Sequence, residues 1–184
     1  LSCKLYMKIN ILMVTGSFYP EVSGSANQCR QLMNQLRIDF HFTVLTTTRN
    51  SNLPSRSLID GVDVHRVLLK GRKYYYYFKA FLSFSTFFLS RKDDFHIVHL
   101  HGFSLKSVLV VFFSKIFIKK TIIKMTSLGH DDPVSIKRRS FLLKSFFSMV
   151  DTYVGVSPRF ESLFHHSQLP SDRLVMIPNF VDTN

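Results

Sequence analysis

The segment "TSLGHDDPVS", residues 126–135, gathers the side chains best suited to chemistry. It places the imidazole of His130 and the carboxyls of Asp131 and Asp132 around a turn that ends at Pro133. Such groups beside a hydroxylated ligand can orient hydroxyls, stabilise developing positive charge or exchange a proton. A structural alternative stays open, because Asp before Pro is common where helices begin, so Asp132 could simply cap the next helix.

A second candidate is "HIVHLHG", residues 96–102, where histidines alternate with apolar residues. Alternate positions of a strand share one face, which would suit a metal ion, but carboxylates and cysteines at ligand spacing are missing nearby. We therefore expect no metal site. His99 is expected within the sheet layers, whereas His101, next to Gly102, should reach the strand end and donate to a hydroxyl or phosphate.

A glycine-containing loop precedes the first helical pattern in "VTGSFYPEVSGSANQCRQLMNQL", residues 14–36. Gly16 and Gly24 would let the backbone approach a ligand, and the following helix N-terminus would present unpaired N–H groups to an anion. The spacing does not fit G-x-G-x-x-G, and no Walker lysine follows. The loop is therefore either an ordinary turn or one that faces phosphates.

The segment "VGVSPRFES" contains Ser157, which could suggest a nucleophile. The pattern G-x-S-x-G is absent, however, because Arg159 stands where the second glycine would be. With Pro158 as the first helical residue, Ser157 is most simply a helix N-cap.

Apolar runs of strand length alternate with helical patterns along the chain. Near-continuous runs of β-branched residues indicate strands that are buried on both faces. The expected strands are 9–15, 42–47, 62–68, 96–102, 121–127, 152–157 and 174–179, and the expected helices are 27–36, 75–89, 105–117, 136–149 and 158–164. This order predicts an α/β domain with a mostly parallel sheet, whose ligands bind outside the carboxyl ends of the strands.

Composition and charge narrow the function classes. Apolar residues make up 46% of the 184 residues and the formal net charge is +12, which favours a polyanionic partner. Basic residues lie beside Phe and Tyr rather than in nucleic-acid motifs, so an anionic bilayer surface is favoured over nucleic acid. The helical run 78–89 is too short and too charged to span a membrane, which leaves either ordinary packing or additional lipid contact.

Localisation follows from the same composition. Cys3 and Cys29 are too few for a disulfide framework, which suits a reducing cytosol. No basic, apolar and small-residue series precedes Met7, so we expect no signal peptide and interpret residues 1–6 as upstream or fragment residues. We expect a cytoplasmic protein, peripheral at the inner face of the cytoplasmic membrane, whose downstream part has been lost.

Four stretches in order resemble the N-terminal half of the retaining family-four glycosyltransferases, which have the GT-B fold. They are "FYPEVSGSANQCRQLMNQL", "DFHIVHLHG", "VDTYVGVSPRFESL" and "RLVMIPNFVDT", and together they cover nearly the whole chain from Met7. The resemblance implies a Rossmann-like acceptor-side domain at 7–178 and the start of an inter-domain linker at 179–184. The C-terminal domain, which would bind the nucleotide-sugar, would lie outside this chain.

The resemblance also implies roles for individual residues. Gly24 matches the second glycine of the loop that meets the donor phosphates, and this loop would include Gly16, Ser23, Gly24 and Ser25. The other residues are His101 and Gly102 at a strand end, Gly129 and Asp131 in a Gly-x-Asp element, Ser157 at an acceptor-side strand end, and Asn179, Val181 and Asp182 in the hinge. Ser23 replaces the first glycine of the family's pair, Leu128 stands where a histidine is frequent, and Phe180 stands where glycine is frequent. His130, Asp131 and His101 are the residues expected to act in catalysis.

The resemblance implies sugar transfer from a nucleotide-sugar to a glycan or lipid-linked acceptor in surface polysaccharide synthesis. Transfer would retain the anomeric configuration and require no metal or other cofactor. The departing phosphate would take the acceptor proton, so no separate general base would be needed. The fragment alone would be inactive. The alternatives are a non-catalytic truncated domain with membrane or acceptor affinity, and a basic nucleic-acid-binding module, which would bind any duplex in a salt-dependent way.

Overall fold

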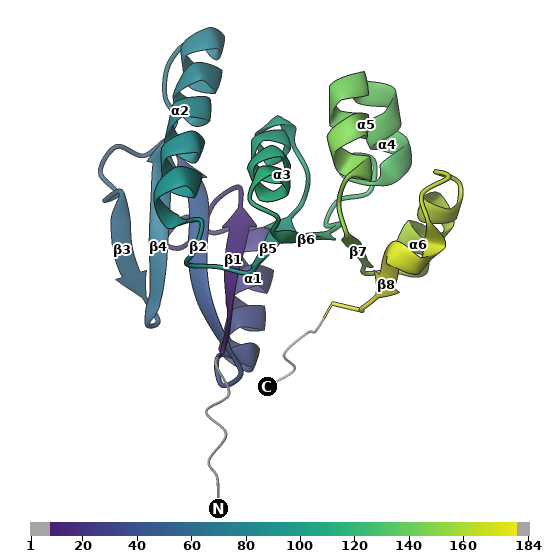
Figure 1. Cartoon of the computed structure of the whole chain (residues 1–184), viewed down its shortest axis with the longest axis horizontal. Coiled ribbons are helices and arrows are strands. Elements are labelled where there is room, and N and C mark those ends of the chain that lie inside the picture. Colours follow the sequence, from purple (N-terminus) through teal and green to yellow (C-terminus); the bar gives the residue numbers. More distant parts are fainter. Residues whose placement is uncertain (1–7, 180–184) are drawn as a thin grey trace, which may run out of the picture.

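The expected strands and one that was not predicted form an eight-stranded sheet in the structure, a computed structural model that describes residues 8–179. The strands are β1 (Ile9–Thr15), β2 (Phe40–Thr48), β3 (Arg56–Ile59), β4 (Val62–Leu68), β5 (Ile97–His101), β6 (Lys120–Lys124), β7 (Thr152–Gly155) and β8 (Leu174–Met176). Their order is β3-β4-β2-β1-β5-β6-β7-β8, and every neighbouring pair is parallel except β3 with β4 (Figure 1). The predicted Rossmann-like α/β fold is confirmed.

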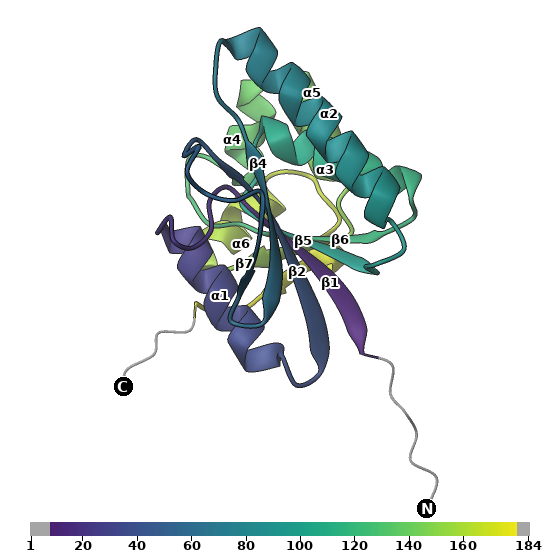
Figure 2. The ribbon, with the colours of Figure 1, turned by 90° about the vertical axis from the view of Figure 1, so that its left-hand side faces the viewer.

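Helices cover the two faces of this sheet unequally. They are α1 (Gly24–Leu36), α2 (Lys73–Arg91), α3 (Leu105–Ile116), α4 (Pro133–Arg139), α5 (Phe141–Ser148) and α6 (Pro158–His165). Figure 2 shows α1 on one side of the sheet and α2, α3 and α5 on the other. The larger core lies under α2, α3 and α5 and is rich in Phe, whereas a smaller core around Cys29 and Met33 lies under α1.

The sheet changes direction at β1, and this position sets where a ligand can bind. From β1 the chain passes through α1 to β2 on one side, and it returns through α2 to β5 on the other. The carboxyl ends of β1 and β5 are thus adjacent, with Val14 paired to Leu100. Crevices in open α/β sheets form at such a switch point, where consecutive connections leave on opposite faces.

Strand β3 was not predicted from the sequence. It is a short edge strand that pairs antiparallel with β4 through a two-residue turn at Asp60 and Gly61, both with positive φ. The short run "RSLI" carries a weak apolar signal, but an Asp-Gly pair between two extended segments is typical of a type I′ hairpin. That pair was the signal that could have located β3.

The expected helix 136–149 is wrong as a single element. Ser140 is extended, with φ −168° and ψ 138°, and it separates α4 from α5. Ile136, Leu143 and Phe147 are all buried. Their spacing of seven and then four residues is also that of one continuous amphipathic helix, so the apolar pattern could not reveal the break.

Helix α2 buries only part of its apolar surface. Ala80, Phe84, Phe87 and Phe88 face the core, whereas several other large aromatic and aliphatic side chains of this helix are exposed. The exposed ones are Phe78, Phe81, Leu82 and Leu89. Because α2 is apolar on nearly all sides, periodicity alone does not identify its buried face. Across residues 8–179, no helix combines the length and the apolar character that crossing a bilayer would demand.

Candidate functional site

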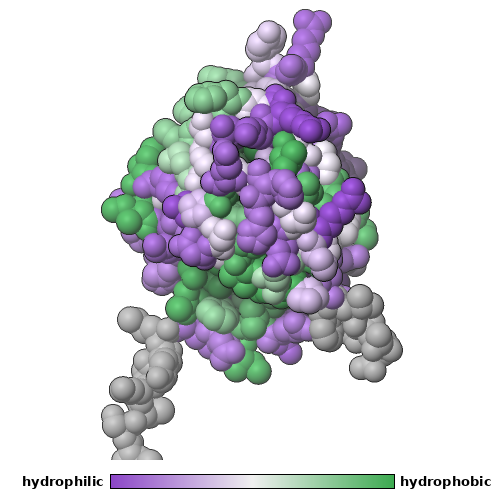
Figure 3. All heavy atoms as spheres, turned by 90° about the vertical axis from the view of Figure 1, so that its right-hand side faces the viewer, coloured by the Kyte–Doolittle hydropathy of each residue, from purple (hydrophilic) through white to green (hydrophobic). Residues whose placement is uncertain are grey.

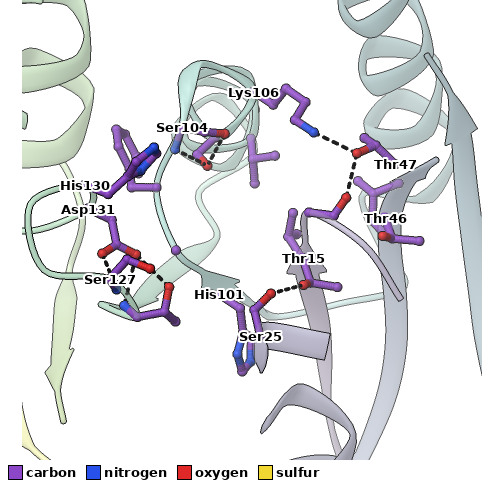
Figure 4. Close-up of a pocket in the computed structure, with 18 of the residues that line it drawn as sticks. Thr15, Ser25, Thr46, Thr47, His101, Ser104, Lys106, Ser127, His130 and Asp131 are labelled. Atoms are coloured by element: carbon purple, nitrogen blue, oxygen red, sulfur yellow. Dashed lines mark hydrogen bonds between the residues drawn. The ribbon is translucent and has the colours of Figure 1, made fainter. Parts of the chain in front are cut away.

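A cavity of about 270 Å³ lies at the carboxyl ends of β1, β2, β5 and β6, at the switch point of the sheet. Its walls carry many hydroxyls, one lysine and one buried imidazole (Figure 4). The polar lining residues are Thr15, Ser25, Thr46, Thr47, His101, Ser104, Lys106, Ser107, Thr126, Ser127, His130 and Asp131. The structure thus brings together the predicted residues Gly16, Ser25, His101, Gly102, His130 and Asp131 around one cavity.

The loop between β1 and α1 is held by its own hydroxyls. Ser17 Oγ donates to Ser23 Oγ over 2.8 Å, and the N–H of Ala26 donates to the same Ser23 oxygen over 3.1 Å. Ser23 is therefore the N-cap of α1. Thr47 Oγ1 donates to the carbonyl of Gly16 over 2.8 Å and fixes the start of the loop. Ser23 and Gly24 do not line the cavity itself, although Ser25 does.

The glycines near the site fall into two kinds. Gly102 and Gly129 have φ of 83° and 78°, so the backbone itself favours glycine there. A Cβ on Gly102 would also lie 3.1 Å from Asp131 Oδ2. Gly16 and Gly24 have no positive φ, and a Cβ on either would meet nothing within 4 Å. The fold of this domain does not require glycine at positions 16 and 24.

His101 is a buried, uncharged imidazole. Burial lowers its pKa well below the usual value, and the nearby His99 and Lys124 lower it further. Among the described residues, neither ring nitrogen has a hydrogen-bond partner. Figure 4 shows the ring directed toward the α1 side of the strand ends, away from Lys106. A neutral imidazole offers one donor and one acceptor, so His101 can bind a hydroxyl from either side.

The buried histidines His99 and His101 should make the free energy of unfolding depend on pH. Burial, with a smaller effect of Lys124, lowers the pKa of His99 to about 4. The unfolded chain therefore takes up protons first, and the free energy of unfolding should fall as pH decreases from about 6.5 to 4. Urea unfolding should show a loss about 1–3 kcal/mol smaller in His99→Gln than in the wild type. The exposed His41→Gln is the control, and equal losses in all three proteins would contradict the prediction.

Asp131 is buried, 2% exposed, and acts as an acceptor within its own loop. Its Oδ2 accepts from Thr126 N–H over 2.9 Å and from Thr126 Oγ1 over 2.8 Å, and its Oδ1 accepts from Ser127 N–H over 2.7 Å. Three donors thus occupy the carboxylate and shape the segment after β6. This geometry makes Asp131 a positioning residue for the cavity wall.

The neighbours of Asp131 have separate roles. Asp132 caps α4, because its carboxylate accepts from Ser135 N–H over 2.9 Å and from Gly129 N–H over 2.7 Å. Burial opposes its ionisation, but these hydrogen bonds outweigh burial and lower its pKa. His130 is exposed at the cavity rim, and Arg139 donates to its carbonyl over 3.2 Å. The alternative that Asp132 is structural is therefore the one that the geometry supports.

Lys106 was missed in the sequence analysis. It lies in the first turn of α3, whose N-cap Ser104 forms a capping box with Ser107. Its Nζ donates to Thr47 Oγ1 over 2.7 Å and so spans the cavity from α3 to β2 (Figure 4). The signal available was its position four residues after the strand-end pair His101 and Gly102.

The remaining predicted residues lie elsewhere. Ser157 is the N-cap residue of α6, makes no side-chain capping bond and does not line the cavity. Asn179 is exposed at the end of the described chain, and Val181 and Asp182 lie outside the described residues. Within residues 8–179 no group of His, Cys, Asp and Glu side chains is arranged to hold a metal ion.

Comparison with known structures identifies the fold. A sucrose-phosphate synthase from Thermosynechococcus elongatus has a TM-score of 0.66 at 13% identity, over 93% of this chain and 48% of that one. The apo lipopolysaccharide outer core galactosyltransferase WaaB has a TM-score of 0.65 at 10% identity, over 96% and 47%. A UDP-GlcNAc 2-epimerase from Neisseria meningitidis, bound to UDP-GlcNAc, has a TM-score of 0.64 at 11% identity, over 91% and 45%.

These likenesses show a shared fold, and the chain spans about half the length of each structure. No curated protein matches the sequence. The model of the glycosyl transferase 4-like domain matches residues 23–179, which include α1, the carboxyl ends of β2, β5 and β6, and the segment that holds His130 and Asp131. On this match the chain belongs to the glycosyl transferase 4-like domain family.

Proposed function

We propose that this chain is the acceptor-side half of a retaining glycosyltransferase. The complete protein moves a sugar from a nucleotide-sugar donor to a glycan or lipid-linked acceptor in surface polysaccharide synthesis. The observation that carries this proposal is the hydroxyl-lined cavity at the switch point, where two lining residues, Thr46 and His101, have buried polar atoms without a partner among residues 8–179. The family match and the likeness to a galactosyltransferase support it.

The acceptor contacts follow from these unpartnered atoms. Thr46 Oγ1 and both ring nitrogens of His101 are buried and lack hydrogen-bond partners among residues 8–179. Leaving such groups unpaired is costly, and sugar hydroxyls can both donate to and accept from them. His101 is therefore the residue we assign to contact with a substrate hydroxyl, while Asp131 holds the wall formed by Thr126 and Ser127.

The donor would approach the loop from Gly16 to Ser25. The N-terminus of α1 carries a positive dipole end, and the open space beside Gly16 and Gly24 leaves room for a diphosphate. The similar epimerase is bound to UDP-GlcNAc, which supports a nucleotide-sugar as ligand of this fold. With the carboxylate of Asp131 occupied by three donors, proton transfer to the departing phosphate is the route that this half of the protein supports best.

The direct test is donor consumption by the complete gene product. A panel of UDP-, GDP- and ADP-sugars would be assayed with bacterial lipid extract as acceptor, and we expect one donor to be consumed with retention of configuration. Consumption with inversion would contradict the retaining mechanism. If no donor is consumed, the transferase proposal fails in favour of a domain that only binds its acceptor or membrane.

The helix layer suits an anionic membrane surface. Helices α2, α3, α4 and α5 contain no Asp or Glu and carry basic residues throughout. Large apolar side chains are exposed on this layer, including Tyr74 at 89% and Phe141 at 83%. Ring contacts of Phe81 with Phe113 and of Phe112 with Phe146 connect α2, α3 and α5. We therefore place the protein at the inner face of the cytoplasmic membrane.

The space-filling view agrees with this assignment. Figure 3 looks onto the end of the molecule where α6 and β8 lie. Hydrophobic side chains gather along the upper left flank, on the side of the helix layer, beside a largely hydrophilic face. Such a mixture of exposed aromatic and basic side chains is typical of interfacial binding rather than of a membrane span.

Vesicle flotation tests the membrane assignment. The chain should float with vesicles that contain phosphatidylglycerol, less so at high salt, and not with purely zwitterionic vesicles. The double variant Phe78→Glu and Phe141→Glu should lower partitioning about tenfold or more, because it removes apolar contact and adds repulsive charge. Ile38→Glu is the matched control, since Ile38 is 75% exposed and follows the end of α1, the helix that covers the other face of the sheet. Equal flotation of both variants would contradict the assignment.

A further inference from the structure

A second hollow adjoins the strand-end cavity. Its volume is also about 270 Å³, and it shares Gly16, Thr47 and Lys106 with the first. Beyond these it is lined by Arg49 after β2, Glu21 in the β1–α1 loop and Tyr76 on α2, among others. The two hollows are therefore neighbours, and a ligand longer than one sugar ring could occupy both.

The second hollow is lined by two cationic side chains, Lys106 and Arg49. Neither Lys106 nor Arg49 forms an ion pair with a carboxylate in residues 8–179. Burial lowers the pKa of Lys106, and the positive charge of Arg49 lowers it further, which indicates that the two charges lie close enough to repel each other. A partly buried positive charge is costly unless an anion accompanies it, so this pair suits an anionic ligand.

Glu21 indicates which further group the ligand carries besides its anionic group. Its Oε1 accepts from Thr48 Oγ1 over 2.9 Å, whereas its Oε2 is buried without a partner among the described residues. One carboxylate against two cations leaves the hollow with a net positive charge. A suitable ligand therefore carries one anionic group for the cations and a hydroxyl that donates to Glu21, which are the features of a glycosyl phosphate.

We propose that Arg49, Lys106 and Glu21 form a binding site for a glycosyl phosphate in the acceptor. Lys106 and Arg49 hold the phosphate oxygens, and Glu21 accepts a hydroxyl of the attached sugar. This inference rests on the proposed function, because it assigns the group beside the acceptor cavity. Tyr76, in the first turn of α2, lies next to the exposed aromatic residues of that helix. A lipid tail on the phosphate would therefore extend toward the helix layer formed by α2, α3, α4 and α5.

The binding test uses the full 184-residue chain with glucose 1-phosphate, inorganic phosphate and UDP as calorimetric probes. Glucose 1-phosphate should bind more tightly than inorganic phosphate, and Lys106→Met or Arg49→Gln should weaken it about tenfold or more. Lys120→Met and Arg37→Gln are matched controls, because both residues are exposed and neither lines the hollow. Lys120 begins β6, and Arg37 is the C-cap residue of α1. Unchanged binding in Lys106→Met and Arg49→Gln would overturn the proposal.

Glu21→Gln separates a glycosyl phosphate from a bare anion. Removal of the negative charge should tighten inorganic phosphate, while the preference for glucose 1-phosphate over inorganic phosphate should decrease. An unchanged preference would overturn the role of Glu21. Tight UDP binding that Lys106→Met abolishes would overturn the acceptor assignment and move the site to the donor phosphates. Because this assay needs no turnover, its result is independent of whether the complete protein transfers sugar.

Discussion

Replacing Gly24 by Trp should abolish sugar transfer by the complete gene product while the domain remains folded. Gly24 begins α1, directly after its N-cap Ser23, and a Cβ there would meet nothing within 4 Å. The indole can therefore extend outward without distorting this domain, and it would cover the N–H groups of the first helical turn. Loss of preorganised donors to a developing phosphate charge typically costs about 100-fold or more in kcat.

The measurement compares kcat/KM and the thermal midpoint of wild type, Gly24→Trp and Val22→Trp. Val22 is 73% exposed two residues earlier in the same loop, so its variant adds the same ring beside the helix start rather than on it. We expect Val22→Trp to retain most activity and both variants to melt near the wild-type temperature. Wild-type turnover by Gly24→Trp would contradict the assignment of this loop to the donor site.

Much of the fold could be predicted from residue patterns alone. The parallel strands are buried on both faces, and their continuous apolar runs made β1, β2, β4 and β5 recognisable. Breaks that depend on one backbone conformation were not recognisable, as at Ser140, where the apolar spacing continues across two helices. The buried face of α2 could not be predicted either, because the helix carries Phe residues on several sides. Only the elements packed against it decide which of them face inward.

Some residues of the candidate site could likewise be predicted from the sequence, and others could not. His101 and Asp131 could be placed near the cavity from sequence, because each lies at or shortly after the carboxyl end of a predicted strand. Thr46, Arg49 and Lys106 are ordinary residue types, and their importance arises only from proximity. That proximity depends on β2 lying beside β1 and on α3 starting above it, which is a consequence of sheet order. The periodicity of apolar residues along one strand or helix does not reveal the order of the strands in the sheet.

The role of Asp131 could not be decided from the sequence. From sequence, a carboxylate next to His130 was equally compatible with catalysis and with turn formation. The structure places three donors from Thr126 and Ser127 on it at 2.7–2.9 Å, with its carboxylate buried. Its contribution should therefore be measurable in the stability of the domain, in the absence of any substrate.

Asp131→Ala should lower the free energy of unfolding by about 3–4 kcal/mol, because it removes the buried, charged acceptor on which two N–H groups and one hydroxyl converge. Asp131→Asn should cost less, about 1–2 kcal/mol, since one amide oxygen still accepts while the amide nitrogen opposes the remaining donors. Urea unfolding of the 184-residue chain measures both. The neighbouring His130→Ala is the control, with an expected change of about 0.5 kcal/mol or less, because its side chain is exposed.

The same variants separate positioning from catalysis in the complete protein. If Asp131 shapes the wall of the acceptor cavity, Asp131→Asn should raise the KM for the acceptor more than it lowers kcat, because the chemistry does not pass through its occupied oxygens. The donor KM should stay near the wild-type value, since the loop from Gly16 to Ser25 is held by separate hydrogen bonds. A variant as stable as wild type that loses kcat alone would instead identify Asp131 as a group that acts on the reacting atoms.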